Sequence, residues 1–264
     1  MEVTQAVDMK SYLYTDNLAI LFAICGVYSY FVRSNWFVAG LLFGLALCTR
    51  QTTIIFPLAI LLLEGWRQYT QLSRLSYTLL RNFVPFLIFL FPVYLWGWNV
   101  NSPYSNAIAK LNNFGFHPKI VTYTVILLGL YSLPLILFYS PSIRNKKIIL
   151  VSVVSTILLI PAFPMMVNEG TNFFVMTSGL VDRFFVSVGY AAYPLIIFIW
   201  IVSLSYFIGQ FRNPKPSFLV IYSRFAILLF ILLQSVYAYS WDKYFIVIVP
   251  FLILLNPALY QKKV

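Results

Sequence analysis

Charged side chains are scarce in this chain. They make up 9% of its 264 residues, apolar residues make up 61%, and the mean hydropathy is +0.85. Soluble globular domains carry about 25% charged residues, so this composition excludes a soluble fold. The apolar residues form long runs, unlike the short alternating segments of a transmembrane β-barrel. The sequence therefore predicts an all-α, polytopic bundle of transmembrane helices, which we expect to form a single domain over residues 1–264.

Thiols and metal-binding side chains are also few. The chain has two cysteines, Cys25 and Cys48, which both fall inside apolar runs, and one histidine, His117. This set indicates neither a disulfide nor a metal site. No Gly-rich phosphate loop or dinucleotide fingerprint is present, so a nucleotide-sugar donor is not indicated. We therefore expect no cofactor, with a divalent metal ion as an open alternative.

Acidic residues are the rarer charged group, with seven against eighteen basic residues and a net charge of +11. The basic residues are scattered between apolar runs rather than gathered in one patch. We attribute them to membrane orientation and expect no nucleic-acid partner. Residues 1–16 contain three acids and no apolar core, so they do not have the pattern of a signal peptide.

Nine apolar runs predict about nine membrane helices, several of them with internal prolines, which membrane helices tolerate better than soluble ones. One interruption, at 49–52, resembles a broken helix, and the second half of the chain shows no matching break. The expected helices cover residues 17–32, 36–48, 52–63, 82–98, 120–139, 148–167, 184–208, 217–239 and 244–258.

The charges predict an orientation for these helices. If the N-terminus lies outside and the chain alternates through nine helices, twelve of the eighteen basic residues and one of the seven acids face the cytoplasm. This excess agrees with the positive-inside rule, and the reversed topology contradicts it. We therefore expect a multi-pass protein with its N-terminus outside and its C-terminus in the cytoplasm. The expected location is the bacterial plasma membrane, or the endoplasmic reticulum membrane if the protein is eukaryotic.

Arg50 stands between two apolar runs that are too short to cross a membrane alone. The runs at 36–48 and 53–63 have 13 and 11 residues, which cover roughly 15–20 Å of a hydrocarbon core of about 30 Å. We expect the arginine in a dip of the outer membrane face, where a cation needs an anion or a water-filled cavity. A lipid phosphate would suit it, because a guanidinium binds phosphate through paired hydrogen bonds. The alternative is a structural ion pair of Arg50 with Asp16 or Asp242.

Three segments carry a resemblance to a known superfamily. Tyr14-Thr15-Asp16 opens the first run, Arg-Gln-Thr follows at 50–52, and residues 241–250 read Trp-Asp-Lys-Tyr-Phe-Ile-Val-Ile-Val-Pro. On these motifs the chain resembles the GT-C superfamily of integral-membrane glycosyltransferases. The most similar family is that of the dolichyl-phosphate-glucose-dependent α-1,2-glucosyltransferases. The matching positions favour the superfamily more firmly than they favour a particular sugar.

The resemblance implies that the chain moves a hexose from a polyprenyl-phosphate-linked donor to a glycan, lipid or protein acceptor on the periplasmic or lumenal face. An arginine and a glutamine would hold the donor phosphate, and the late acidic-basic pair would contact the donor head group. The 168–183 loop would add acceptor or donor contacts, with a solvated loop as the alternative. The substrate-binding residues implied are Tyr14, Arg50, Gln51, Glu169, Asp182, Arg183, Asp242 and Lys243.

The catalytic carboxylate is where the chain departs from the superfamily. GT-C enzymes begin with a cytoplasmic N-terminus, one helix and a first outer loop that carries the catalytic acidic residue. We expect this opening part to be missing here, as in a fragment, a truncated product or a degenerate relative. Two candidates for the catalytic role remain. Asp16 would line the cavity or orient Arg50, and Asp8 would stand in for the absent general base.

A second class of function fits the same arginine. A transporter or flippase for lipid-linked or anionic solutes would use Arg50 as a substrate site at a broken helix. Such transporters often contain two similar halves with paired breaks, which the sequence does not show. A scaffold subunit is a third reading. In every case, membrane lipids are expected partners.

Overall fold

The computed structural model describes the chain in pieces. Its longer segments are 2–71, 118–139, 145–159, 187–212, 216–236 and 247–255. Side chains are described from residue 17 onward, except those of Gln51, Lys119, Tyr190 and residues 176–178 and 239–241. The shorter pieces are 73–74, 76–78, 80–81, 87, 116, 176–178, 184, 239–241 and 245. Two compact units are present, Met1–Ser102 and Pro103–Val264, and each is described by itself.

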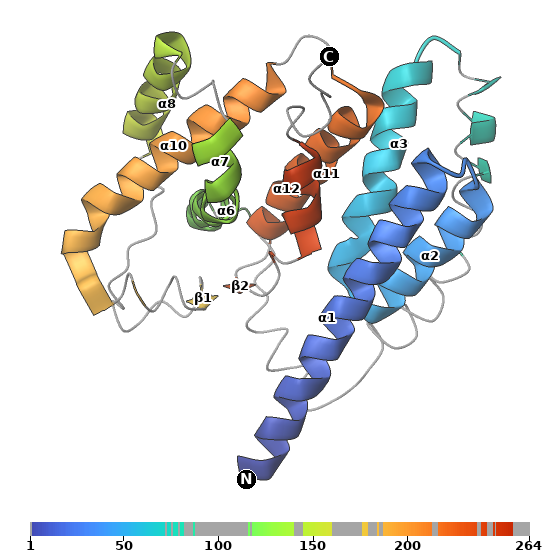
Figure 1. The fold of residues 1–264 in the computed structure, drawn as a ribbon, viewed down its shortest axis with the longest axis horizontal. Helices are drawn as coiled ribbons and strands as arrows, with labels where there is room; N and C mark the ends of the chain where they lie inside the picture. The colour runs from blue at the N-terminus through green and yellow to red at the C-terminus, as the bar shows by residue number, and fades with distance from the viewer. Residues whose placement is uncertain are drawn as a thin grey trace. The chain divides into compact units, whose positions relative to one another are not determined.

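Within residues 2–71, the first unit contains three α-helices and a short 3₁₀ segment. They are α1 (Glu2–Phe31), α2 (Trp36–Thr49), η1 (Gln51–Ile54) and α3 (Ile55–Gln68). Helix α1 packs along α2 over most of the length of α2 (Figure 1). The expected helix at 17–32 is too short, because α1 begins at Glu2 and residues 2–16 belong to it.

A tight turn makes α1 and α2 antiparallel. Ser34 adopts a left-handed backbone with φ of 51°, and the Asn35 amide N–H donates to the Ser29 carbonyl at 2.9 Å. The Asn35 side-chain oxygen then caps α2 by accepting from the Val38 N–H at 3.1 Å. Asparagine is among the preferred N-cap residues because its short side chain reaches this amide. The polar residues between the two apolar runs therefore define where one helix ends and the next begins.

Small residues allow α1 and α2 to approach closely. Ala19 and Ala23 of α1 are buried, and a Cβ added at Gly26 would lie 2.8 Å from the Phe43 ring. The GxxxG pair of α2 is also buried. Packing of small residues is the usual basis of close helix contacts in membranes, where lipid offers no hydrophobic driving force between helices.

The second unit is also helical. Helix α6 packs against α10 and α11, α8 packs against α10, and α12 packs against α11 (Figure 1). The elements are α6 (Pro118–Tyr131), α7 (Leu133–Tyr139), α8 (Lys146–Leu159), η5 (Gly189–Ala192), α10 (Tyr193–Phe211), α11 (Phe218–Val236) and α12 (Val249–Leu254).

Polar and small residues hold the centre of this unit together. A Cβ added at Gly129 of α6 would lie 1.6 Å from Ser203 Oγ of α10, so the two helices approach as closely as glycine allows. The buried Ser205 hydroxyl donates to Ser152 Oγ at 2.9 Å and joins α10 to α8. The Ser152 hydroxyl in turn donates to the Ile148 carbonyl at 2.9 Å, so this chain of bonds is satisfied inside the unit.

A short parallel pair of strands is the exception to the all-α architecture. Strand β1 (Met176–Ser178) pairs with β2 (Tyr239–Trp241), and Thr177 is the Cα partner of Ser240. The two strands are far apart in sequence, and β2 also contacts α6. The pairing therefore joins the 168–183 segment to the segment that follows α11.

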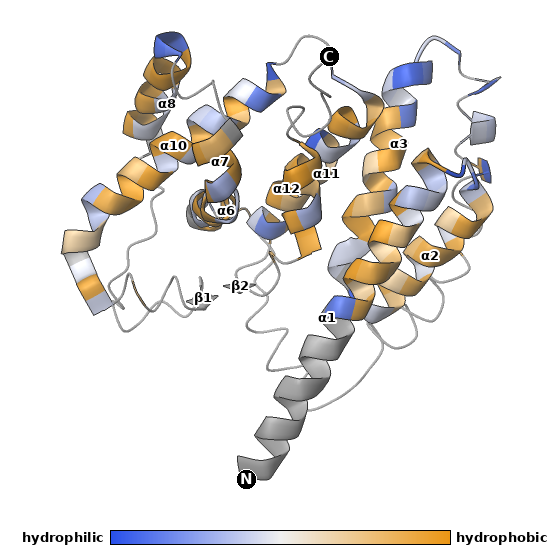
Figure 2. Ribbon diagram, viewed as in Figure 1, coloured by the Kyte–Doolittle hydropathy of each residue, from blue (hydrophilic) through white to orange (hydrophobic). Residues whose placement is uncertain are grey.

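The described helices confirm an all-α protein but not nine membrane spans. Within the described residues, two helices, α10 and α11 with 19 residues each, are long and apolar enough to cross a membrane. Figure 2 shows apolar residues along most of both helices. Helices α2, α3 and α6 have 14 residues each, or about 21 Å. The expected helix at 82–98 lies outside the described residues.

The second half also contains an interruption that the sequence did not reveal. The expected helix at 120–139 is divided at Ser132 into α6 and α7, just before Pro134. Proline lacks an N–H and crowds the preceding turn, which is sufficient reason for a kink there. Ser132 is fully buried. The Ser132 N–H donates to the Leu128 carbonyl at 3.0 Å and the Ile136 N–H donates to the Ser132 carbonyl at 2.9 Å, so helical hydrogen bonding continues through this kink.

Candidate functional site

Arg50 lies at a true break between two helices. Helix α2 ends at Thr49, Arg50 has extended backbone angles of φ −150° and ψ 116°, and η1 begins at Gln51. The backbone thus leaves helical geometry at one residue and re-enters it at the next. The prediction of a helix break at 49–52, made from run lengths alone, agrees with this geometry.

Threonine hydroxyls satisfy the backbone at the break. Thr49 Oγ1 donates to the Ala46 carbonyl at 2.7 Å, and the Arg50 N–H donates to the same carbonyl at 2.8 Å. On the other side, Thr53 donates to the Arg50 carbonyl from Oγ1 at 2.7 Å and from its N–H at 3.0 Å. Irregular backbone inside a membrane needs such internal partners, since lipid supplies none. Thr49 and Thr53 therefore stabilise the helix break within which they lie.

Buried polar atoms gather at this break. Arg50 Nη2 and Thr52 Oγ1 are both buried, and Thr52 Oγ1 has no hydrogen-bond partner within the described part of the chain. The helical segment that starts at Gln51 continues into α3, and the first turn of a helix presents N–H groups that favour an anion. Pro57 lies in the first turn of α3, where a missing N–H costs no helical bond. A cation, a hydroxyl and a helix N-terminus thus lie within three residues of one another along the chain.

The register of α1 against α2 places Asp16 close to the level of Arg50. The close approach of Gly26 to Phe43 fixes this register. Arg50 lies seven residues after Phe43, at the end of α2, and Ala19 lies seven residues before Gly26 on α1. In an antiparallel pair these positions lie at about the same level. Asp16 is three residues further, which is about 4.5 Å, slightly less than one helical turn.

The same register separates the two catalytic candidates. Asp8 lies on α1 eight residues before Asp16, which is about 12 Å along the helix axis. Tyr14 also lies on α1, half a turn from Asp16. The side chains of these residues and of Gln51 lie outside the described part. On backbone position, Asp16 is the better candidate of the two carboxylates.

The other predicted site residues fall in the second unit. Ser178 of β1 is the Cα partner of Trp241 of β2, and Trp241 directly precedes the Asp-Lys pair in the sequence. The strand pairing therefore connects the two segments that carry these candidates, a connection that no local sequence pattern could indicate. The candidates themselves lie outside the described residues: Glu169, Asp182, Arg183, Asp242 and Lys243.

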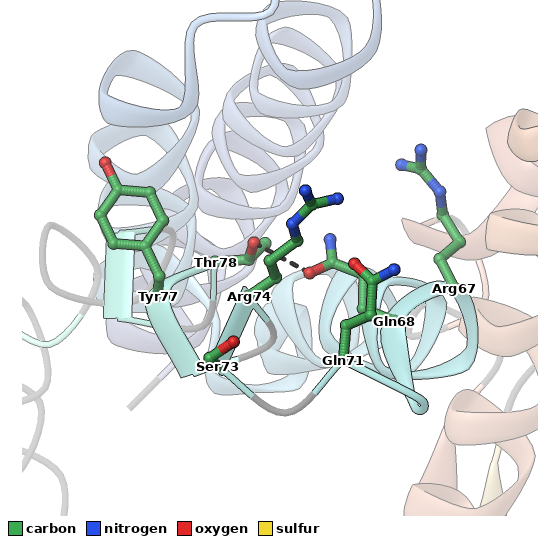
Figure 3. A pocket seen from close by; sticks show the side chains of 7 residues that line it. All are labelled: Arg67, Gln68, Gln71, Ser73, Arg74, Tyr77 and Thr78. Atoms are coloured by element: carbon green, nitrogen blue, oxygen red, sulfur yellow. Dashed lines mark hydrogen bonds between the residues drawn. The ribbon is translucent and has the colours of Figure 1, made fainter.

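A polar cluster at the other end of α3 was not among the predicted sites. Glu64 is 4% exposed and accepts hydrogen bonds from Tyr30 Oη at 2.6 Å, Arg67 Nη1 at 3.2 Å and Gln68 Nε2 at 2.9 Å. Gln68 Oε1 accepts from Thr78 Oγ1 at 3.2 Å. These bonds indicate a structural role for Glu64. Beside this cluster lies an open pocket of about 530 Å³ (Figure 3).

Metal ligands do not cluster within the described residues, where no group of three or more histidine, cysteine or acidic side chains could hold an ion. Comparison of the chain with protein-family models, with curated proteins and with solved structures gives no match in any of the three.

Proposed function

We propose that this chain is a polytopic membrane glycosyltransferase that uses a polyprenyl-phosphate-linked hexose, and that Arg50 binds the phosphate of this donor. The observation that carries the proposal is the helix break, with a buried guanidinium nitrogen at its centre. A structural cation needs no such break, because a side chain on a continuous helix can reach a partner. An interrupted helix exposes backbone N–H groups to a ligand.

The chemistry of the break suits a phosphate. A guanidinium presents donors in a planar fork that matches two phosphate oxygens. Thr52 Oγ1 adds a hydroxyl that lacks a partner within the described residues, and the N-terminus of η1 and α3 adds a favourable dipole. Asp16, one helical turn from this level on α1, is then placed to orient Arg50 or to accept a proton from the acceptor hydroxyl.

Unit 1 supports the proposed topology by its internal arrangement. Tyr30 of α1 bonds to Glu64 of α3, and the Arg81 guanidinium lies 5.7 Å from the Trp36 ring centroid. The predicted orientation assigns Glu64 and Arg81 to the cytoplasmic face, and these two contacts lie at one end of the unit. Arg50 lies at the opposite end of α2. The proposal places the site on the outer face, with the N-terminus outside and nine helices in the membrane.

The donor role is tested with the full chain in lipid nanodiscs and a radiolabelled polyprenyl-phosphate hexose. Arg50→Lys should lower transfer and donor binding by about 100-fold, because an ammonium keeps the charge but loses the paired hydrogen bonds, worth about 1.5–3 kcal/mol. Arg33→Lys is the matched control, since Arg33 is an exposed arginine of the same unit. Near-wild-type transfer by Arg50→Lys would exclude the donor-phosphate role.

The topology is tested separately by labelling single cysteines in intact cells, in a background that carries Cys25→Ser and Cys48→Ser. Ser105→Cys and Ser178→Cys should react with an impermeant maleimide added from outside. Ser73→Cys, at an exposed position near the end of α3, should react only after permeabilisation. Labelling in the opposite sense would overturn the orientation and the outer location of the site.

A transporter or flippase is the second candidate, and one observation favours it. The broken helix at Arg50 suits a substrate site of this class as well. In the second half, α6 and α7 are separated by a kink at Ser132, across which helical hydrogen bonding continues. Proteoliposomes distinguish the two functions. A transporter moves a lipid-linked or anionic solute across the bilayer without forming a glycosidic bond, whereas the enzyme consumes the donor.

A further inference from the structure

A pocket lies at the end of unit 1 that is remote from Arg50. Its volume is about 530 Å³, within the range of pockets that hold small ligands. An adjoining hollow of about 560 Å³ shares Gln71, Ser73 and Arg74 with it and adds Thr70. The pocket residues are Arg67, Gln68, Gln71, Ser73, Arg74, Tyr77 and Thr78.

The floor of this pocket is held in place by hydrogen bonds. Gln68 donates to Glu64 and accepts from Thr78, so its amide is fixed between α3 and the helical residues that follow Ser73. Thr78 is 8% exposed and Glu64 is 4% exposed. Because all these bonds are internal, the floor is preformed and needs no rearrangement to accept a ligand.

The walls of the pocket are cationic. Figure 3 shows the Arg67 and Arg74 side chains flanking the amides of Gln68 and Gln71. Glu64 lies behind the pocket, where it already accepts from Tyr30, Arg67 and Gln68, and no carboxylate lines the pocket among the described residues. The lining thus offers guanidinium, amide and hydroxyl donors. Arg67 is ion-paired with Glu64, so the net positive charge of the lining comes from Arg74, and it favours an anion with several acceptor oxygens.

The surroundings of the pocket are those of a membrane interface. Large aromatic side chains are exposed there, with Trp66 at 55%, Tyr69 at 72% and Tyr77 at 65%. The Arg81 guanidinium lies 5.7 Å from the Trp36 ring centroid and 6.0 Å from that of Tyr77. Figure 2 shows this polar end of α3 following directly on its apolar length. Tyrosine, tryptophan and arginine at the end of an apolar helix are typical of the head-group layer.

We propose that this pocket binds the phosphate-bearing head group of an anionic glycerophospholipid on the face opposite to Arg50. The apolar surface of α3 then meets the acyl chains, since Leu62, one turn before the polar end, is 44% exposed. The two arginines contact the phosphate, and the Gln71 amide and Ser73 hydroxyl contact the polar head group. This site is independent of the glycosyltransferase proposal and holds for a transporter equally well.

The test measures lipid preference by native mass spectrometry of the full chain, released from nanodiscs that contain phosphatidylglycerol and phosphatidylcholine. Wild type should retain phosphatidylglycerol in preference to phosphatidylcholine. Arg74→Gln should reduce that preference about fivefold, the effect of one interfacial cation. Arg74 is exposed, so its replacement should leave the fold intact, which a melting curve and size-exclusion profile check. Arg74→Lys should retain most of the preference.

Two controls make the result specific. Arg212→Gln removes another exposed arginine, at the C-terminal cap of α10, and should leave the preference unchanged. The proposal is overturned by a wild type without preference, by an Arg74→Gln variant that keeps it, or by an equal loss in Arg212→Gln. Inorganic phosphate added to phosphatidylcholine nanodiscs should raise the melting temperature little, and full protection by it would assign the pocket to a soluble anion instead.

Discussion

The Tyr30 hydroxyl donates a 2.6 Å hydrogen bond to Oε1 of Glu64, which joins the end of α1 to α3. Glu64 is the buried member of its ion pair with Arg67, since their side chains are 6% and 44% exposed. The pair itself contributes little, because one partner reaches solvent. The tyrosine bond matters more, since it links two helices and helps to satisfy a carboxylate that would otherwise be costly to bury.

Removing this hydroxyl should weaken unit 1 measurably. Tyr30→Phe should lower the free energy of unfolding by about 1–3 kcal/mol, because a buried acceptor loses a partner while the ring is kept. Tyr28→Phe is the matched control on the same helix, where the side chain is 48% exposed, and it should change stability by less than about 0.5 kcal/mol. Denaturant titration in detergent compares the two variants. Equal losses in the free energy of unfolding would show that the Tyr30–Glu64 bond stabilises the unit no more than the exposed Tyr28 hydroxyl does.

Adjacent threonines at the Arg50 break should respond in opposite ways. Thr53 is 1% exposed and its hydroxyl donates to the Arg50 carbonyl at 2.7 Å, so Thr53→Val should cost about 1 kcal/mol. The buried Thr52 hydroxyl has no partner within the described residues, so Thr52→Val should be neutral or stabilising.

Ligand binding separates the two threonines further. If the break binds a phosphate, Thr52→Val should weaken donor binding although it leaves the fold as stable as wild type. Titration of the donor against each variant, together with unfolding in detergent, measures both effects. A Thr52→Val variant that loses stability would show that its hydroxyl is already engaged, and the break would then offer no such group to a ligand.

Alanine substitutions at three glycines should change stability in an order set by how closely neighbouring atoms approach each glycine. Gly129→Ala should destabilise unit 2 by about 1–3 kcal/mol, the usual cost of overpacking, because the new Cβ would lie 2.4 Å from Ser203 Cβ and 3.3 Å from its Cα. Gly65→Ala is the control, since nothing lies within 4 Å of its added Cβ, and it should stabilise α3 by about 0.5–1 kcal/mol. Gly26→Ala should fall between them, because the Phe43 ring can move. Melting temperatures in detergent give the order.

Local patterns were enough to predict some features of the chain. The polar interruption at 49–52 predicted the helix break because it needs only the lengths of two apolar runs. The start of α2 at Trp36 followed from the polar residues before it, and Asn35 does cap that helix. Gly40 and Gly44, which have the GxxxG spacing typical of close helix packing, are both buried.

Two local features were missed. The helical start of α1 at Glu2 was missed because its first residues are polar, and the kink at Ser132 was missed because the apolar run is unbroken there. Features that depend on contacts distant in sequence could not be predicted. The floor of the pocket joins Thr78 to Gln68 through side-chain bonds that hydropathy does not register. The pairing of β1 with β2 falls in the same class.

That strand pairing provides a direct test of whether the two candidate loops of unit 2 meet. Thr177 and Ser240 are Cα partners in parallel strands, and neighbouring strands lie about 4.8 Å apart, within the Cα separation that a disulfide bridges. With Cys25→Ser and Cys48→Ser, the double variant Thr177→Cys with Ser240→Cys should therefore cross-link readily under mild oxidation, as a mobility shift on a gel shows. The control pairs Thr177→Cys with Ser217→Cys, since Ser217 precedes the 19-residue helix α11, and α11 places it about 28 Å from β2. Cross-linking of both pairs, or of neither, would contradict the register. A cross-link confined to the first pair would place the segments that carry Asp182 and Asp242 side by side, as a shared head-group site requires.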